Sequence, residues 1–475
     1  MSEHSHFFNK IFRWQLYATV YISLIQLVTI ILLGRYLPYK ELGSFALFQI
    51  VFRFALYSLD PGMFFSIIQK HEYNWELIKL LLRKQLLYII FSALGLVFIM
   101  LFTTTFNEIH PIITANCFVI ILLIGIGSYA QSKLVVDFRQ KEIVIAQMIA
   151  YSAELIFLVI LCNYYNPMII FTFGVVLRFV LFYGICFLFQ LQQQKIEQTY
   201  QVLKEDVKSH FTQSKFNIWS QILSFVQGQY DTVIIIVLFG LPVLGGYILV
   251  TEISYMIFAK INPLFNKAII PVVSKSFLNK SNTSTIISES LISYSYLIFI
   301  LYLLFWNFRS ELFQFAYPEK YQDLVYYASF LIPIALCKAM NNILVSYLVA
   351  LSESRKIFYW NIIILIINYT IILCFYLFKG SLNNFLIMGL GYGILSLLTI
   401  YFLMNQILED KNIQLSLSIN KWFILILIMF MLVYIIKIWV GYFFISMILS
   451  IICILILLYI FEKERVTKWC KLSIV

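Results

Sequence analysis

Apolar runs of about 20 residues recur along the 475-residue chain, and a helix of this length can cross the hydrocarbon core of a bilayer. Hydrophobic residues make up 62% of the chain and charged residues only 12%, whereas soluble domains are about half apolar and a quarter charged. The alternating pattern of transmembrane barrel strands is not seen. The sequence therefore predicts an all-α protein that crosses the membrane many times.

These runs predict about fourteen membrane-spanning helices, with twelve as the lower bound. If the amino terminus is cytoplasmic, 25 of the 34 Lys and Arg residues lie in cytoplasmic segments or at the cytoplasmic ends of spans, six lie on the outer side and three lie near the middle of spans. This asymmetry follows the positive-inside rule, so we expect both termini in the cytoplasm. It also accounts for the net charge of +11, and we expect no nucleic-acid partner. The expected helices cover residues 12–33, 42–68, 79–102, 112–131, 144–163, 168–190, 216–239, 243–260, 285–308, 324–351, 357–378, 384–406, 420–436 and 440–461.

Two short segments of the chain repeat each other. Gly43 and Gly245 are 202 residues apart, and the pairs Asp60-Pro61 and Asn262-Pro263 share this offset. A repeat unit of six helices returns the chain to the same side of the membrane, so we expect two parallel, pseudo-symmetric lobes with a binding site between them. The expected parts are an N-terminal lobe at 1–190, an amphipathic cytoplasmic linker on the membrane surface at 191–215, a C-terminal lobe at 216–408, and two additional helices with a cytoplasmic tail at 409–475.

The segments that carry the repeat also resemble a known family. They are LGRYLPYKELGSFAL (33–47), SLDPG (58–62), YDTVIIIVLFGLPVLGGYILVTEI (230–253) and AIIPVVSKSF (268–277). Together they resemble the polysaccharide transporter family, which includes the Wzx-type O-antigen flippases. This family belongs to the superfamily shared with multidrug exporters and lipid II flippases. The proline after Asp60 departs from the family, where small or apolar residues are commoner at that position.

The resemblance implies a flippase of the bacterial inner membrane rather than an enzyme. Its substrate would be an undecaprenyl-pyrophosphate-linked oligosaccharide, such as an O-antigen unit used in lipopolysaccharide biosynthesis. This substrate would move from the cytoplasmic to the outer leaflet by cation-coupled alternating access. The expected partners are the lipid-linked glycan and membrane lipids, with a polysaccharide polymerase and a chain-length regulator as further candidates.

Three basic residues lie near the middle of predicted spans rather than at their ends, namely Arg53, Arg178 and Lys338. A charge within the bilayer is costly, so it normally faces a partner or a water-filled cavity and is a candidate functional residue. We expect these three to line a cationic cleft that binds the substrate pyrophosphate, because the arginine fork matches phosphate oxygens. The alternative is that Arg53–Asp60 and Arg178–Glu154 are structural ion pairs.

Four acidic residues in the spans are candidates for ion coupling or for pairing, namely Asp60, Glu154, Asp231 and Glu252. A carboxylate in a low-dielectric site can load and release a proton, and the same oxygens can hold Na⁺. The pattern does not choose between H⁺ and Na⁺, and we expect no other cofactor. The seven cysteines are scattered without a CxxC pair, which indicates neither a metal site nor a disulfide.

Other functions fit parts of the pattern. A membrane-embedded glycosyltransferase or acyltransferase would need a histidine or carboxylate pair at the membrane face, but all five histidines fall in tails or loops. A multidrug exporter of cationic compounds would favour an acidic cleft. A lipid II flippase also uses a basic cleft, so composition does not exclude it. A non-transporting assembly protein would not need so many buried charges.

Overall fold

The computed structural model describes residues 3–50, 53, 111–137, 139–191, 204–278, 283–351, 353–377, 380–410 and 447–452. The elements in these ranges are all helices, and eight of them are long and apolar enough to cross a membrane. The predicted all-α, multi-pass membrane fold is therefore confirmed. The predicted helices at 42–68 and 440–461 are helical where the structure describes them, at residues 42–50, 53 and 447–452. Those predicted at 79–102 and 420–436 lie outside the described residues.

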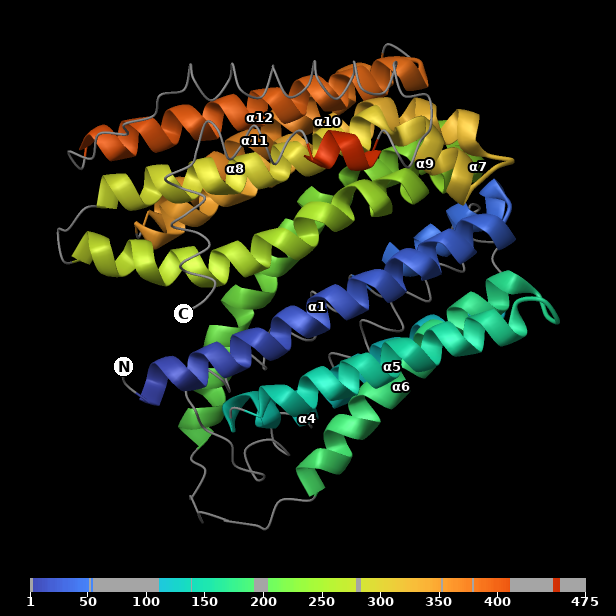
Figure 1. The fold of residues 1–475 in the computed structure, drawn as a ribbon, viewed down its shortest axis with the longest axis horizontal. Helices are drawn as coiled ribbons and strands as arrows, with labels where there is room; N and C mark the ends of the chain where they lie inside the picture. The colour runs from blue at the N-terminus through green and yellow to red at the C-terminus, as the bar shows by residue number, and fades with distance from the viewer. Residues whose placement is uncertain are drawn as a thin grey trace. The chain divides into compact units, whose positions relative to one another are not determined.

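The chain forms two compact units, Met1–Leu249 and Val250–Val475. The first unit contains α1 (Glu3–Tyr36), α4 (Pro111–Val136), α5 (Gln140–Leu161) and α6 (Pro167–Leu191). In Figure 1, α5 and α6 lie side by side, with α1 along α5 and α4 along α6. The contact between α4 and α6 is close at Gly127, where a β-carbon would lie 2.2 Å from the ring of Tyr183.

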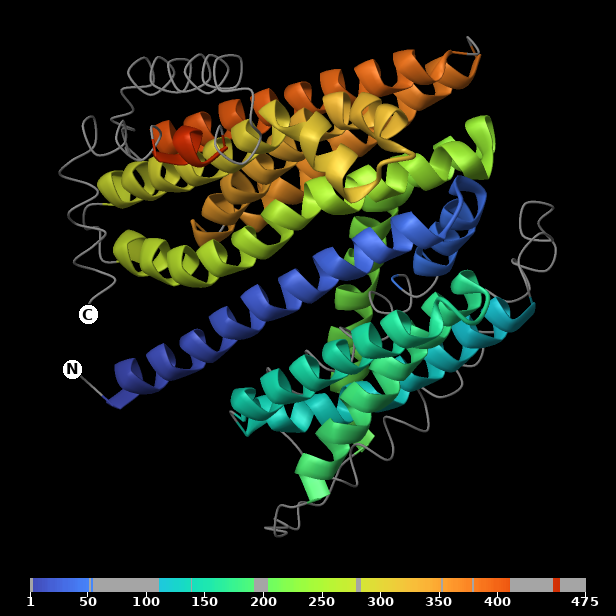
Figure 2. The same cartoon turned by 45° about the vertical axis from the view of Figure 1, so that its right-hand side comes forward.

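The second unit is organised around α10 (Tyr321–Ala350). This helix packs against α8 (Thr283–Asn307), α9 (Arg309–Ala316), α11 (Ser354–Leu377) and α12 (Leu382–Asp410) (Figures 1 and 2). The interior of the second unit holds three buried tyrosines whose hydroxyls make hydrogen bonds, namely Tyr294, Tyr302 and Tyr347. Bonding these hydroxyls offsets the cost of burying a polar group away from water.

The predicted spans agree with α4, α5, α6, α8, α10, α11 and α12 to within a few residues at each end. The short helix α9 was not predicted, because its eight mixed polar and apolar residues carry no membrane-spanning signal. The lobe boundaries remain a prediction.

The longest helical stretch, α7 (Lys204–Leu278), differs from its prediction at both ends. It breaks once, at Gly240, where φ is 83°, and this confirms the predicted break between 239 and 243. Residues 204–215 are helical and continue directly into α7, and the surface linker at 191–215 stays a prediction. Its charged residues form helix readily, and no Gly or Pro interrupts them.

Prolines within the spans do not end the helices. The helix α7 continues through Pro263 and Pro271, and α10 continues through Pro333. Neighbouring helices and polar side chains can satisfy the backbone groups that a proline leaves free inside a membrane bundle. The predicted end at residue 260 was therefore too early.

The two Gly/Pro turns of the repeat lie against each other within the first unit. A β-carbon on Gly43 would lie 2.1 Å from the carbonyl oxygen of Leu241, and one on Gly245 would lie 2.0 Å from that of Tyr39. The positions 39 and 241 are separated by the same 202 residues as 43 and 245. The contact is thus reciprocal, and each half of it needs a glycine because backbone meets backbone.

Candidate functional site

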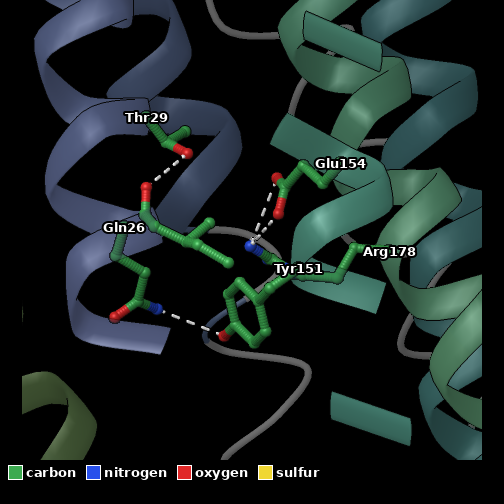
Figure 3. Close-up of polar contacts among 6 residues, drawn as sticks. Gln26, Thr29, Tyr151, Glu154 and Arg178 are labelled. Carbon is green, nitrogen blue, oxygen red and sulfur yellow. Dashed lines mark hydrogen bonds and ion pairs between the residues drawn. The ribbon is translucent and has the colours of Figure 1, made fainter. Parts of the chain in front are cut away.

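A polar cluster in the first unit contains two of the predicted site residues. Glu154 on α5 is 2% exposed, and Arg178 on α6 donates from Nη1 to Oε2 at 2.9 Å and to Oε1 at 3.3 Å. Figure 3 shows the guanidinium reaching from α6 to the carboxylate. Gly174 on α6 lies beside this pair, and a β-carbon there would meet Leu158 Cδ2 at 3.1 Å and Glu154 Cγ at 3.6 Å.

Aromatic rings and an amide from α1 complete this cluster. The guanidinium carbon of Arg178 lies 4.9 Å from the ring centre of Tyr151 and 5.2 Å from that of Phe179. The Tyr151 hydroxyl accepts a hydrogen bond from Gln26 Nε2 at 3.2 Å, which links α5 to α1 (Figure 3). Cation–π contacts of this kind are strongest where water is excluded. The Arg178 side chain is therefore fixed from two sides.

The pair does not use the whole guanidinium. Both hydrogen bonds to Glu154 come from Nη1, so Nε and Nη2 make no hydrogen bond to any residue in the described ranges. A planar fork with two nitrogens left over can still bind an anion such as a phosphate oxygen. The alternative of a structural ion pair is thus compatible with a binding role for the same arginine.

The candidate Lys338 lies on α10 in the second unit. Its Nζ is 4.5 Å from the ring centre of Tyr255 on α7. The contact keeps the ammonium over an aromatic face.

The candidate carboxylate Asp231 is 6% exposed and lies on α7 in the first unit. One oxygen accepts from Thr232 N at 2.8 Å and from Thr232 Oγ1 at 3.3 Å. The other oxygen accepts from Tyr247 Oη at 2.8 Å. Because Tyr247 follows directly after Gly245-Gly246, this bond connects the carboxylate to the second turn of the repeat.

The remaining candidates are less informative. Arg53 and Glu252 are half-buried, and Asp60 lies outside the described residues, so the proposed Arg53–Asp60 pair stays a prediction. Within the described ranges, no group of three or more His, Cys, Asp or Glu side chains is arranged to hold a metal ion.

Sequence reasoning missed several residues that shape the site. Tyr151 lies one helical turn before Glu154 on the same face, a spacing that could have marked it. Gln26 is an amide in an apolar run and could also have been noted as a polar residue in a span. No feature of the neighbouring sequence indicated a role for Phe179 or Tyr247.

Comparison with known proteins agrees with this architecture. The sequence matches the family described as polysaccharide biosynthesis protein over residues 10–277, more than half of the chain. The chain belongs to the polysaccharide biosynthesis protein family. No match was found among curated proteins.

Solved structures establish the fold of this polysaccharide biosynthesis protein. It is similar to the lipid II flippase MurJ in an inward closed conformation, with a TM-score of 0.67 and 16% identity, covering 94% of this chain and 98% of that one. It is also similar to a single-residue mutant of the Vibrio cholerae MATE transporter VcmN, with a TM-score of 0.56 and 14% identity, covering 86% and 98%. The chain therefore shares its fold with these two structures.

Proposed function

We propose that this polysaccharide biosynthesis protein is a flippase that moves an undecaprenyl-pyrophosphate-linked oligosaccharide, such as an O-antigen unit, from the cytoplasmic to the outer leaflet of the bacterial inner membrane. The observation that carries the proposal is Arg178. It lies near the middle of a candidate membrane span, contacts the rings of Tyr151 and Phe179, and keeps Nε and Nη2 free of hydrogen bonds to the described residues. These two nitrogens can bind the anionic group of a ligand that moves within the membrane.

Glu154 acts in this proposal as the residue that positions Arg178. The two charges together are neutral, so the arginine can be buried without an uncompensated charge. The phosphate oxygens of the substrate then bind to Nε and Nη2 of Arg178. Lys338, the predicted cation in the second unit, lies over the ring of Tyr255. The family supports a role in polysaccharide assembly, and the fold supports transport rather than catalysis.

We assign cation coupling to Asp231. Binding of H⁺ or Na⁺ to this carboxylate competes with the hydrogen bond from Tyr247. Since Tyr247 follows the turn that meets Gly43, loss of the bond would loosen the contact between the two turns. A cation gradient could in this way drive alternating access.

The test is a translocation assay in proteoliposomes. The probe is undecaprenyl pyrophosphate carrying a fluorescent N-acetylglucosamine, and dithionite outside the vesicles quenches only the probe in the outer leaflet. With the wild-type protein, quenching should extend to the probe that began in the inner leaflet. With Arg178→Gln it should stop at the outer leaflet. Arg309→Gln is the matched control, because Arg309 also stacks on a ring, that of Trp306, but lies outside the spans.

A double variant separates binding from bracing. Arg178→Gln alone leaves Glu154 as a buried unpaired charge, at a cost of about 3–5 kcal/mol. Arg178→Gln/Glu154→Gln removes both charges and should restore the yield of folded protein, but not translocation. If the double variant translocates the probe as the wild type does, Arg178 is only a structural residue. If the wild type moves no probe, the proposed function is wrong.

A further inference from the structure

The phenol hydroxyl of Tyr151 belongs to the same polar cluster as Arg178. Tyr151 lies on α5, one turn before Glu154, and its ring centre is 4.9 Å from the guanidinium carbon of Arg178. Figure 3 shows the guanidinium between the Glu154 carboxylate and this ring. The three residues belong to the first unit. The Tyr151 side chain therefore lies against the arginine on the side away from its ion-pair partner.

Gln26 on α1 determines which way the Tyr151 hydroxyl points. A tyrosine hydroxyl has one proton to donate and also accepts hydrogen bonds at its oxygen. Gln26 Nε2 donates to Tyr151 Oη at 3.2 Å, so this bond occupies the oxygen and directs the proton elsewhere. Tyr151 makes no other hydrogen bond to a described residue. The hydroxyl proton is thus an unused donor.

The unused groups around the guanidinium share one chemical character. Arg178 Nε and Nη2 make no hydrogen bond to the described residues, and they are donors, like the Tyr151 hydroxyl. Phosphate oxygens only accept hydrogen bonds, whereas a hydroxyl or amide of a ligand also brings a donor of its own. A set of donors on and beside a guanidinium therefore suits a phosphate better than a neutral polar group.

The exposure of the side chains shows which part of the ion pair a ligand can reach. The Arg178 side chain keeps 16% of its surface exposed, compared with 3% for Glu154. Tyr151 and Gln26 are half-buried. The carboxylate is thus covered, and the accessible part of the pair belongs to the arginine. Because the Tyr151 ring is in contact with the guanidinium, a group that binds to the arginine lies close to Tyr151 as well.

We propose that Tyr151 donates its hydroxyl proton to the anion bound at Arg178, and that Gln26 is the positioning residue that turns the hydroxyl toward this anion. The inference rests on the proposed function. It adds a binding residue on α5 and a positioning residue on α1 to the arginine of α6. Since Gln26 acts through the hydroxyl, its effect on binding should disappear when the hydroxyl is removed.

The experiment is a double-mutant cycle on the purified full-length protein in nanodiscs, with undecaprenyl pyrophosphate as the titrated probe. Tyr151→Phe keeps the ring over the guanidinium and should raise the Kd about tenfold, the effect of one lost hydrogen bond to a charged group. Gln26→Leu should raise the Kd by about two- to fivefold, because the hydroxyl remains but is neither oriented nor polarised by the amide. In the Tyr151→Phe background, Gln26→Leu should leave the Kd unchanged.

Two controls separate anion binding from packing between the helices. Undecaprenol has the same chain without the phosphates, and its binding should be the same for the wild type and for each variant. Tyr21 on α1 shares a hydrogen bond of 2.8 Å with Ser152 on α5. Tyr21→Phe therefore removes a hydrogen bond between the same two helices, and it should keep the wild-type Kd for undecaprenyl pyrophosphate.

The possible results distinguish the inference from the proposed function. If Tyr151→Phe binds undecaprenyl pyrophosphate as the wild type does while Arg178→Gln loses binding, the inference is wrong and the proposed function stands. If Gln26→Leu raises the Kd equally in both backgrounds, or Tyr21→Phe raises it as much as Tyr151→Phe, these contacts only join α1 to α5, which also overturns the inference. If the wild type does not bind the probe, the proposed function fails with it.

Discussion

Replacing Gly43 by alanine tests the contact between the two turns of the repeat. The new β-carbon would lie 2.1 Å from the carbonyl oxygen of Leu241 and 2.8 Å from its carbon, whereas ordinary contacts begin at 3.4 Å. The turns must therefore separate by about 1 Å. Because the obstacle is backbone, no side-chain rotation can relieve the overlap. Overpacking of this kind costs about 1–3 kcal/mol.

This cost applies only to conformations in which the turns touch. A penalty of about 2 kcal/mol shifts the ratio between closed and open turns by about 30-fold. Ser44, the next residue, is 5% exposed and should become accessible when the turns separate. We therefore expect a Ser44→Cys variant without the native cysteines to react with a maleimide at least several-fold faster when Gly43→Ala is added. Gly245→Ala should act in the same way, because its β-carbon would meet the Tyr39 oxygen at 2.0 Å.

The matched control is Gly184→Ala on α6, where a β-carbon would meet nothing within 4 Å. It should leave both the labelling rate and translocation unchanged. The same substitution chemistry is thus compared at a crowded and at an open glycine. If Gly43→Ala labels and transports like the wild type, the reciprocal contact does not limit any conformation of the protein.

Three further predictions follow from individual contacts. Asp231→Asn should abolish the dependence of translocation on a cation gradient, whereas Tyr247→Phe should only weaken this dependence. The measurement is the translocation rate in proteoliposomes with and without an imposed H⁺ or Na⁺ gradient. Gly174→Ala should change thermal stability little, because its β-carbon would meet the movable end of Leu158 at 3.1 Å and the gain in helix propensity of about 1 kcal/mol offsets the crowding. Burial raises the pKa of the Cys162 thiol to about 11. Because the thiolate is the reactive form, the rate of alkylation of Cys162 should rise about tenfold per pH unit up to that pH. A plateau of this rate near pH 8.5 would contradict the prediction.

The site could be predicted in part from the sequence. Arg178 and Glu154 stood out because charges are rare in apolar spans, and their pairing was one of two alternatives. The pattern could not choose between these alternatives, because the residues are 24 positions apart on different helices. Tyr151 and Gln26 were missed because a tyrosine or an amide in a span costs far less than a charge and gives a weaker signal.

The sequence by itself determined which segments cross the membrane and where α7 breaks at Gly240. These features depend on local properties, namely the length of an apolar run against the thickness of the bilayer and the backbone freedom of a glycine. Only the tertiary structure decided that Gly43 meets Leu241 while Gly245 meets Tyr39, and which atoms of the buried polar residues remain unbonded. The rotation of each helix about its axis sets these contacts, and it is fixed by packing against neighbouring helices rather than by hydropathy.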